Sequence, residues 1–169
     1  MNGPPQSQAI LLAEDNADDV LLIRLALEKA GSADLLRVVR DGEEVLHYLQ
    51  GEGAFADRIQ FPVPDLLLLD LAMPRMSGLD ATQHLRQKAP KVKVLLLTLH
   101  KDRESILRVI QAGADGYVSK QDSIDEVVGA IHAVHKGRPF FSPELTKAAM
   151  RQLSQNGGKD GPVERLTPR

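Results

Sequence analysis

Four short apolar segments of this 169-residue chain each end in residues whose side chains could carry out chemistry. These residues are an acidic pair, a third acid, a hydroxyl and an ammonium: Glu14-Asp15, Asp70, Thr98 and Lys120. Three carboxylates that lie close together cannot all stay ionised without a cation. Their oxygens suit Mg²⁺ better than zinc, and a carboxylate beside Mg²⁺ can attack phosphorus. A hydroxyl and an ammonium would then bind the phosphoryl oxygens, so the residue types favour phosphoryl-transfer chemistry.

The apolar segments that precede these residues alternate with stretches of helical spacing. Strands are predicted at 9–13, 35–39, 66–69, 92–97 and 116–119. Helices are predicted at 18–30, 43–50, 79–88, 103–112 and from Ser123 to Gly137. Strands that are apolar on both faces and separated by helices indicate a parallel sheet covered on both sides. Five such units favour an α/β, flavodoxin-like (βα)5 doubly wound sheet with strand order 2-1-3-4-5.

In that strand order, strands one, three, four and five are neighbours, and ligands bind outside their carboxyl ends. The carboxylates, the hydroxyl and the ammonium are therefore predicted to converge on one edge of the sheet. Taken singly, each residue has a simpler explanation: Asp15, Asn16 or Asp18 could cap the following helix, and a lone lysine after a strand is usually solvated. The agreement of residue type and position at four strand ends favours a shared site.

The composition excludes several other classes of site. Apolar residues make up 43% of the chain and aromatic residues 4%, which fits a globular protein with an aliphatic core. The absence of cysteine excludes disulfides, thiolate metal ligands and cysteine nucleophiles. No apolar run is long enough to cross a membrane, and the first residues do not resemble a signal peptide. We therefore expect a cytoplasmic protein with no membrane partner.

The motifs around these residues resemble the receiver domain of two-component response regulators over residues 9–137. The resemblance rests on the acidic pair after AILLA, on LLLLDLAMPRMSG (66–78), on LLLT (95–98) and on GADGYVSK (113–120). It implies that Asp70 accepts a phosphoryl group from a sensor histidine kinase or a phosphotransfer protein. It also implies that the protein is a signalling switch that catalyses only its own phosphorylation and dephosphorylation, and is not otherwise an enzyme.

The resemblance also implies a role for each residue of the site. Mg²⁺ would be held by Glu14, Asp15, Asp70 and the main-chain carbonyl of Ala72. Thr98 and Lys120 would bind the phosphoryl oxygens. Thr98 would move on phosphorylation, the aromatic ring of Tyr117 would follow, and the face made by helix four, strand five and helix five would change. The family pattern suggests a homodimer through that face.

Three positions depart from the family pattern or leave the lifetime of the phosphorylated state open. Leu99 follows the switch threonine, where small residues are common, and could slow the entry of the phosphodonor or of water. Ala72 and His100 occupy positions that tune hydrolysis in relatives, and the alanine offers no side chain to position water.

The last part of the chain differs in character from the body. Residues 1–135 hold 20 acidic and 14 basic residues, whereas residues 136–169 hold 3 acidic and 7 basic residues. Residues 137–153 resemble the linker of LuxR-type regulators, and RLTPR (165–169) resembles the start of their helix-turn-helix domain. We expect a receiver domain at 1–137, followed at 138–169 by a linker helix and a flexible tail that leads to an output domain absent from this chain.

On this interpretation the protein controls transcription and contacts DNA only through that absent domain. The alternative is a single-domain response regulator that acts through protein–protein contacts, and the long link at 51–64 resembles one subgroup of such receivers, some of which serve phytochrome-type kinases. The aromatic residues of this link either fold back onto the body or contact a partner.

Three other functions are compatible with parts of the pattern. A haloacid-dehalogenase-type phosphatase also combines Asp, Thr, Lys and Mg²⁺, but it expects a second Asp where this chain has Ala72. A flavodoxin-like cofactor binder needs amides and hydroxyls in its first loop, where this chain has the acidic EDNADD. The complete acidic set argues against a degenerate receiver that signals without phosphate.

Overall fold

Five parallel strands form a single twisted sheet in the computed structural model, which describes residues 8–99, 103–141, 147, 150, 151 and 154. The strands are β1 (Ile10–Ala13), β2 (Leu36–Val39), β3 (Leu66–Asp70), β4 (Lys93–Thr98) and β5 (Gly116–Ser119). Their order is β2-β1-β3-β4-β5, so the predicted flavodoxin-like topology is confirmed. Each predicted strand boundary lies within one residue of the observed one.

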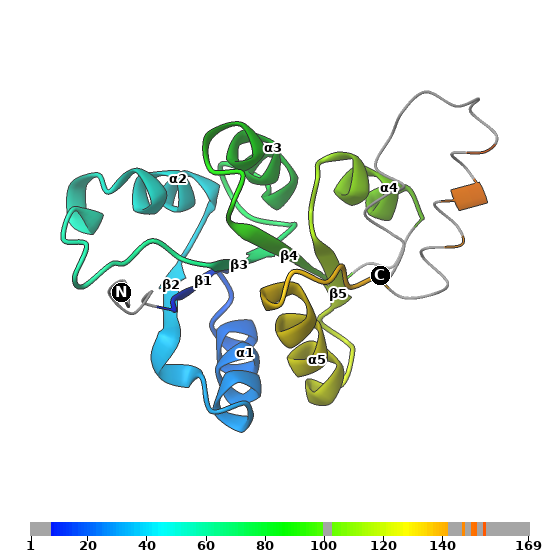
Figure 1. Cartoon of the computed structure of the whole chain (residues 1–169), viewed down its shortest axis with the longest axis horizontal. Helices are drawn as coiled ribbons and strands as arrows, with labels where there is room; N and C mark the ends of the chain where they lie inside the picture. Colours follow the sequence, from blue (N-terminus) through cyan, green and yellow to red (C-terminus); the bar gives the residue numbers. More distant parts are fainter. Residues whose placement is uncertain (1–7, 100–102, 142–146, 148–149, 152–153, 155–169) are drawn as a thin grey trace, which may run out of the picture.

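Helices cover both faces of this sheet (Figure 1). They are α1 (Ala17–Lys29), α2 (Gly42–Gln50), α3 (Gly78–Lys88), α4 (Arg103–Gln111) and α5 (Ile124–His135), with short 3-10 turns at Ala33–Leu35 and Gly53–Phe55. The α1 and α5 helices lie on one face, and α2, α3 and α4 lie on the other. No helix in the described part of the chain is long and apolar enough to span a membrane.

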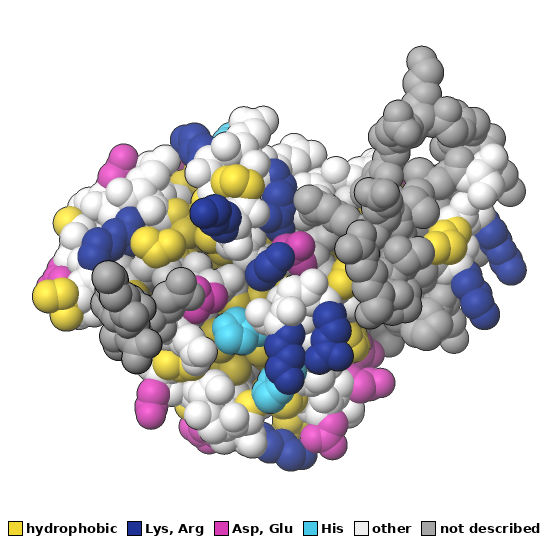
Figure 2. Space-filling view, viewed as in Figure 1, with side chains coloured by type: hydrophobic (Ala, Val, Ile, Leu, Met, Phe, Trp, Pro, Cys, Tyr) yellow, Lys and Arg dark blue, Asp and Glu magenta, His cyan; other side chains and the backbone are white. Residues whose placement is uncertain are grey.

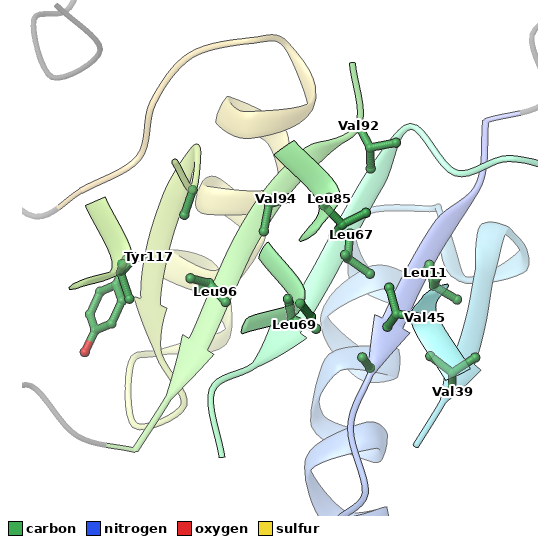
Figure 3. Packing of buried hydrophobic residues seen from close by; sticks show 14 of the residues in the cluster. Leu11, Val39, Val45, Leu67, Leu69, Leu85, Val92, Val94, Leu96 and Tyr117 are labelled. Carbon is green, nitrogen blue, oxygen red and sulfur yellow. The ribbon is translucent and has the colours of Figure 1, made fainter. Parts of the chain in front are cut away.

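The leucine run of β3 supplies both halves of the core. Leu67 and Leu69 point toward α2, α3 and α4, where they pack with residues of the neighbouring strands (Figure 3). Leu66 and Leu68 point to the opposite face, under α1 and α5. Since side chains alternate across a strand, only a central strand covered on both faces can bury four consecutive leucines. Burial of each such side chain contributes about 1.5–3 kcal/mol, which anchors β3 in the centre of the sheet.

Polar caps set where the helices begin. Asn16 caps α1, because its side chain accepts hydrogen bonds from the backbone N–H groups of Asp18 and Asp19. Ser123 forms a capping box with Glu126 at the start of α5. Histidines lie in the last turn of α5, where positive charge is favourable at the helix C-terminus. Lysine, arginine and histidine side chains gather over α5 on the face shown in Figure 2.

The link between α2 and β3 folds back onto α2. The rings of Phe55 and Phe61 lie 5.2 and 5.9 Å from the ring of Tyr48. Arg58 donates hydrogen bonds of 2.7 Å to the carbonyls of Tyr48 and Leu49 at the end of α2. These contacts support the simpler of the two interpretations of the link. Its Ile59, however, is 95% exposed.

The segment after α5 extends the sheet at the outer edge of β5. Phe140 forms an isolated parallel bridge with Gly116, and its carbonyl accepts a 2.9 Å hydrogen bond from the N–H of Tyr117. Phe140 packs on the α1 and α5 side of the core, whereas Phe141 packs on the opposite side. Farther along the chain, the described residues Lys147, Met150, Arg151 and Ser154 are helical, in the region of the predicted linker helix. RLTPR and the segment before it lie outside the described residues.

A glycine is required where α3 starts against the end of β3. A Cβ atom at Gly78 would lie 2.2 Å from the carbonyl oxygen of Asp70, which is a backbone atom and cannot swing away. We expect Gly78→Ala to lower the free energy of unfolding by about 3 kcal/mol. Urea unfolding followed by circular dichroism measures this loss.

The matched control is Gly129→Ala in α5, where a Cβ atom meets nothing within 4 Å. Because alanine favours the helical state over glycine, this variant is expected to gain up to about 1 kcal/mol. Equal stabilities for the two alanine variants would show that the close approach at Gly78 is not a constraint.

Candidate functional site

The carboxyl ends of β1, β3, β4 and β5 meet at one edge of the sheet. Ala13 pairs with Leu69 in the strand register, and Thr98 pairs with Ser119. The ladder continues past the strand ends, because the N–H of Lys120 donates a 2.8 Å hydrogen bond to the carbonyl of Thr98. The residues that follow these strands are therefore held side by side at this edge.

Three carboxyl groups gather there from two separate segments. Glu14, Asp15 and Asp70 each offer one carboxylate oxygen, and these oxygens all lie within 4.8 Å of one another. Glu14 and Asp70 are buried, whereas Asp15 is exposed and opens the group to solvent. The three donors are hard oxygens, without an imidazole or thiolate among them, and this set fits a cation such as Mg²⁺.

Lys120 lies among these carboxylates with a side chain that is only 6% exposed. Its Nζ is 2.5 Å from Oε2 of Glu14 and 3.4 Å from Oδ2 of Asp70. A second short contact, of 2.7 Å, joins Nζ to Oδ2 of Asp19 in the first turn of α1. The structure thus brings one ammonium to the carboxylates that the strand ends were predicted to assemble.

Sequence reasoning did not single out Asp19. It stands beside Asp18 in an acidic first helical turn, and acids are common there because they stabilise helix N-termini. The available signal was its place in α1, which starts directly after the acidic pair. That signal could not distinguish Asp19 from Asp18, whose side chain has no contact with Lys120 among the described hydrogen bonds and ion pairs.

Backbone groups orient the two buried carboxylates. The N–H of Ala72 donates to Oδ1 of Asp70 at 3.3 Å, and the N–H of Asn16 donates to Oε1 of Glu14 at 3.0 Å. The Ala72 side chain is exposed. Asp70 is therefore fixed by the turn that follows it, with one oxygen directed to that turn and the other toward Lys120.

The two predicted switch residues are both buried. Thr98 ends β4, one residue beyond the pairing of Asp70 with Leu97. Tyr117 is 2% exposed and belongs to the core cluster on the α2, α3 and α4 side of the sheet (Figure 3). Leu99, the first residue after β4, is 53% exposed. His100 lies outside the described residues.

Burial also shifts the ionisation of the cluster. It raises the pKa of Glu14 and of Asp70 above their ordinary values, against the opposing effect of Lys120. Burial by itself would lower the pKa of Lys120, but hydrogen bonds to Asp19 and Glu14 outweigh it, and the pKa lies above its ordinary 10.5. The folded protein therefore holds the ammonium charged and disfavours the ionised carboxylates, a situation that a bound cation would relieve.

We expect Asp70→Asn to raise the free energy of unfolding at neutral pH in a chelating buffer. A raised carboxyl pKa means that the folded chain binds the proton of Asp70 more tightly than the unfolded chain, so ionised Asp70 disfavours folding. The amide removes this cost and keeps an oxygen for the N–H of Ala72. Urea unfolding across pH should show the largest gain at neutral pH and none below the ordinary carboxyl value of 3.8.

A carboxylate at the opposite end of the sheet provides the control. Asp115 accepts hydrogen bonds from Arg86, at 2.6 Å, and from the N–H of Val94, at 2.9 Å. Asp115→Asn is expected to lose about 1–3 kcal/mol, since it weakens bonds to a charged group. A loss of the same size in Asp70→Asn would contradict the cost assigned to the Asp70 carboxylate.

Known proteins resemble this chain in sequence and in fold. The family model of the response regulator receiver domain matches residues 10–132. The transcriptional regulatory protein DegU of Brevibacillus brevis is 34% identical over 123 residues, which are 73% of this chain and 49% of that protein. The chain spans about half the length of this curated relative.

Two solved structures show the same fold over most of their length. The response regulator RPA3017 in red light signalling of R. palustris is 34% identical, with a TM-score of 0.66, and the match covers 75% of this chain and 90% of that one. A LuxR-family two-component response regulator from Aurantimonas sp. SI85-9A1 is 28% identical, with a TM-score of 0.68 and coverage of 86% and 97%. These matches favour a receiver over the phosphatase and the cofactor binder. The chain belongs to the response regulator receiver domain family.

Proposed function

We propose that this receiver domain is switched by phosphorylation of Asp70. The observation that carries the proposal is the buried ammonium of Lys120, which lies 3.4 Å from Oδ2 of Asp70 inside the acidic group. In the transfer step, a carboxylate oxygen of Asp70 attacks the phosphorus of a phosphohistidine. The phosphorus–nitrogen bond breaks as the new phosphorus–oxygen bond forms, and the imidazole leaves with the electron pair and takes up a proton. Water reverses the switch by attacking phosphorus, which releases inorganic phosphate and restores the carboxylate.

Glu14, Asp15, Asp70 and the main-chain carbonyl of Ala72 would hold Mg²⁺ in this site. When bound, Mg²⁺ would neutralise the negative charge of these carboxylates and of the phosphoryl oxygens. Asp15 is the exposed member of the acidic group, which gives the cation a route from solvent. Thr98 and Lys120 would bind the phosphoryl oxygens, and both stand at the same edge as Asp70.

Thr98 and Tyr117 would transmit the structural effect of phosphorylation from the site to the surface of the domain. Both side chains are buried at the carboxyl half of the sheet, so a shift of Thr98 requires its neighbours to repack. Tyr117 also donates its backbone N–H to Phe140, the residue that leads into the last segment of the chain. We infer that the face formed by α4, β5 and α5 reports the phosphorylation state.

The proposed partner is a sensor histidine kinase or a phosphotransfer protein, which the chain meets in the cytoplasm. DegU is named a transcriptional regulatory protein and is about twice as long as the matched segment, which supports a receiver at 1–137 and a linker at 138–169 that serves a DNA-binding domain. The match over 90% of the crystallised chain of the red-light regulator supports the second candidate, a single-domain response regulator that acts through protein–protein contacts.

Acetyl phosphate with Mg²⁺ is expected to add one phosphoryl group to the wild-type chain, because the small donor needs no kinase surface. Asp70→Asn should abolish the addition, since an amide is not a nucleophile toward phosphorus. Intact-mass spectrometry recorded promptly after mixing measures the product, and a chelator should prevent its formation.

Asp65→Asn is the matched control for this labelling. Asp65 directly precedes β3, so it lies at the opposite end of the strand from Asp70. The control is expected to label like the wild type. Labelling that persists in Asp70→Asn would remove Asp70 from the proposed role.

Mg²⁺ is expected to stabilise the unphosphorylated chain. At one hundred times its Kd, a ligand specific to the folded state adds about 2.7 kcal/mol to the free energy of unfolding. Asp15→Asn removes one of the three clustered carboxylates and should lose most of this gain. Asp18→Asn, an exposed acid outside the cluster, should keep it. Thermal unfolding with and without MgCl₂ tests this, and an undiminished shift in Asp15→Asn would exclude Asp15 as a ligand.

A further inference from the structure

Asp19 makes a contact with Lys120 that the proposed phosphorylation chemistry does not require. Its Oδ2 lies 2.7 Å from Nζ, whereas Oδ2 of Asp70 lies at 3.4 Å. Asp19 is not one of the three residues whose oxygens cluster within 4.8 Å. Its backbone is fixed by a hydrogen bond from its N–H to the capping side chain of Asn16. The Asp19 carboxylate is thus directed to the ammonium and not to the cation site.

An ammonium has three N–H donors, and the two shortest contacts of Lys120 are with residues at the α1 side of the site, Glu14 and Asp19. A phosphoryl group on Asp70 would bring new anionic oxygens that compete for the same donors. The third donor, which faces Asp70 at 3.4 Å, can take one phosphoryl oxygen, but a closer approach of the ammonium to the phosphoryl group would lengthen the short contacts on the α1 side. The Asp19 side chain is 26% exposed, so water can solvate its carboxylate when the ammonium withdraws.

Glu14 is less suited to release Lys120. Its side chain is 1% exposed, and its other oxygen accepts the N–H of Asn16. Loss of the ammonium would leave the buried Glu14 carboxylate with the bound cation alone as its counter-charge, whereas water can solvate the partly exposed Asp19 carboxylate, so release from Asp19 costs less. When Lys120 binds phosphoryl oxygens, the contact that weakens is therefore the one with Asp19.

We propose that Asp19 is a positioning residue that holds Lys120 on the α1 side of the unphosphorylated site and opposes its transfer to phosphoryl oxygens on Asp70. Its negative charge also draws the ammonium toward α1 and so reduces the competition of Lys120 with a cation for the Asp70 carboxylate. Asp19 therefore favours cation binding before phosphorylation and restrains the phosphorylation itself. This inference rests on the proposed phosphorylation of Asp70.

The test compares Asp19→Asn with Asp18→Asn in the full chain. The control removes the same charge from the same helical turn, at an exposed side chain. Asp19→Asn is expected to bind Mg²⁺ about two- to fivefold more weakly by titration calorimetry, the range of one partly exposed ion pair. At saturating Mg²⁺ its initial rate of labelling by acetyl phosphate is expected to rise about two- to fivefold. Asp19→Glu keeps the charge and should return both quantities toward the wild-type values.

The opposite directions of the two effects separate positioning from a structural role, since loss of local structure would lower both quantities. If Asp19→Asn matches Asp18→Asn in both measurements, or loses both, the inference is overturned while phosphorylation of Asp70 stands. If the wild type itself is not labelled, the proposed function fails instead, and the calorimetric comparison still decides whether Asp19 restrains Lys120.

Discussion

The ion pairing of one buried ammonium with several carboxylates governs the architecture of the site. Lys120 comes from the end of β5, whereas its partners come from the end of β1, the start of α1 and the end of β3. Charges removed from water are tolerated only when they are paired with good geometry, so the sheet edge must hold these elements in register. The parallel ladder meets that requirement, because each strand end is fixed by hydrogen bonds to its neighbour.

The fold keeps this edge rigid by burying β3 on both faces and by closing the turn after it. The leucines of β3 anchor the strand in two cores, and Gly78 lets α3 start against the carbonyl of Asp70. Asp70 therefore has little freedom to move away from Lys120. In the proposed switch, a shift at Asp70 would have to be absorbed by the strands hydrogen-bonded to β3, which are β1 and β4, and through β4 by β5.

Much of the fold could be predicted from the sequence, because its signals are local. The leucine run of β3 shows its burial on both faces, and a serine followed three residues later by glutamate marks the start of α5. The meeting of Glu14-Asp15, Asp70 and Lys120 followed from strand order, since the carboxyl ends of parallel strands share one edge. The roles proposed for Thr98, Ala72 and Tyr117 rest on family resemblance.

Contacts that depend on side-chain direction could not be predicted in the same way. Asp18 and Asp19 are neighbouring residues of the same type. Only the orientation of α1 about its axis decides that Asp19 faces Lys120. The exposure of Ile59 beside two packed phenylalanines depends on the path of the link, which Arg58 fixes through carbonyls at the end of α2. No sequence pattern marks the pairing of Phe140 with β5, because this pairing uses backbone groups that every residue type except proline offers. That pairing has a mechanical consequence: tension applied along residues 138–141 would be transmitted directly to the backbone of Asp115 and Tyr117, the two residues that are hydrogen-bonded to Phe140.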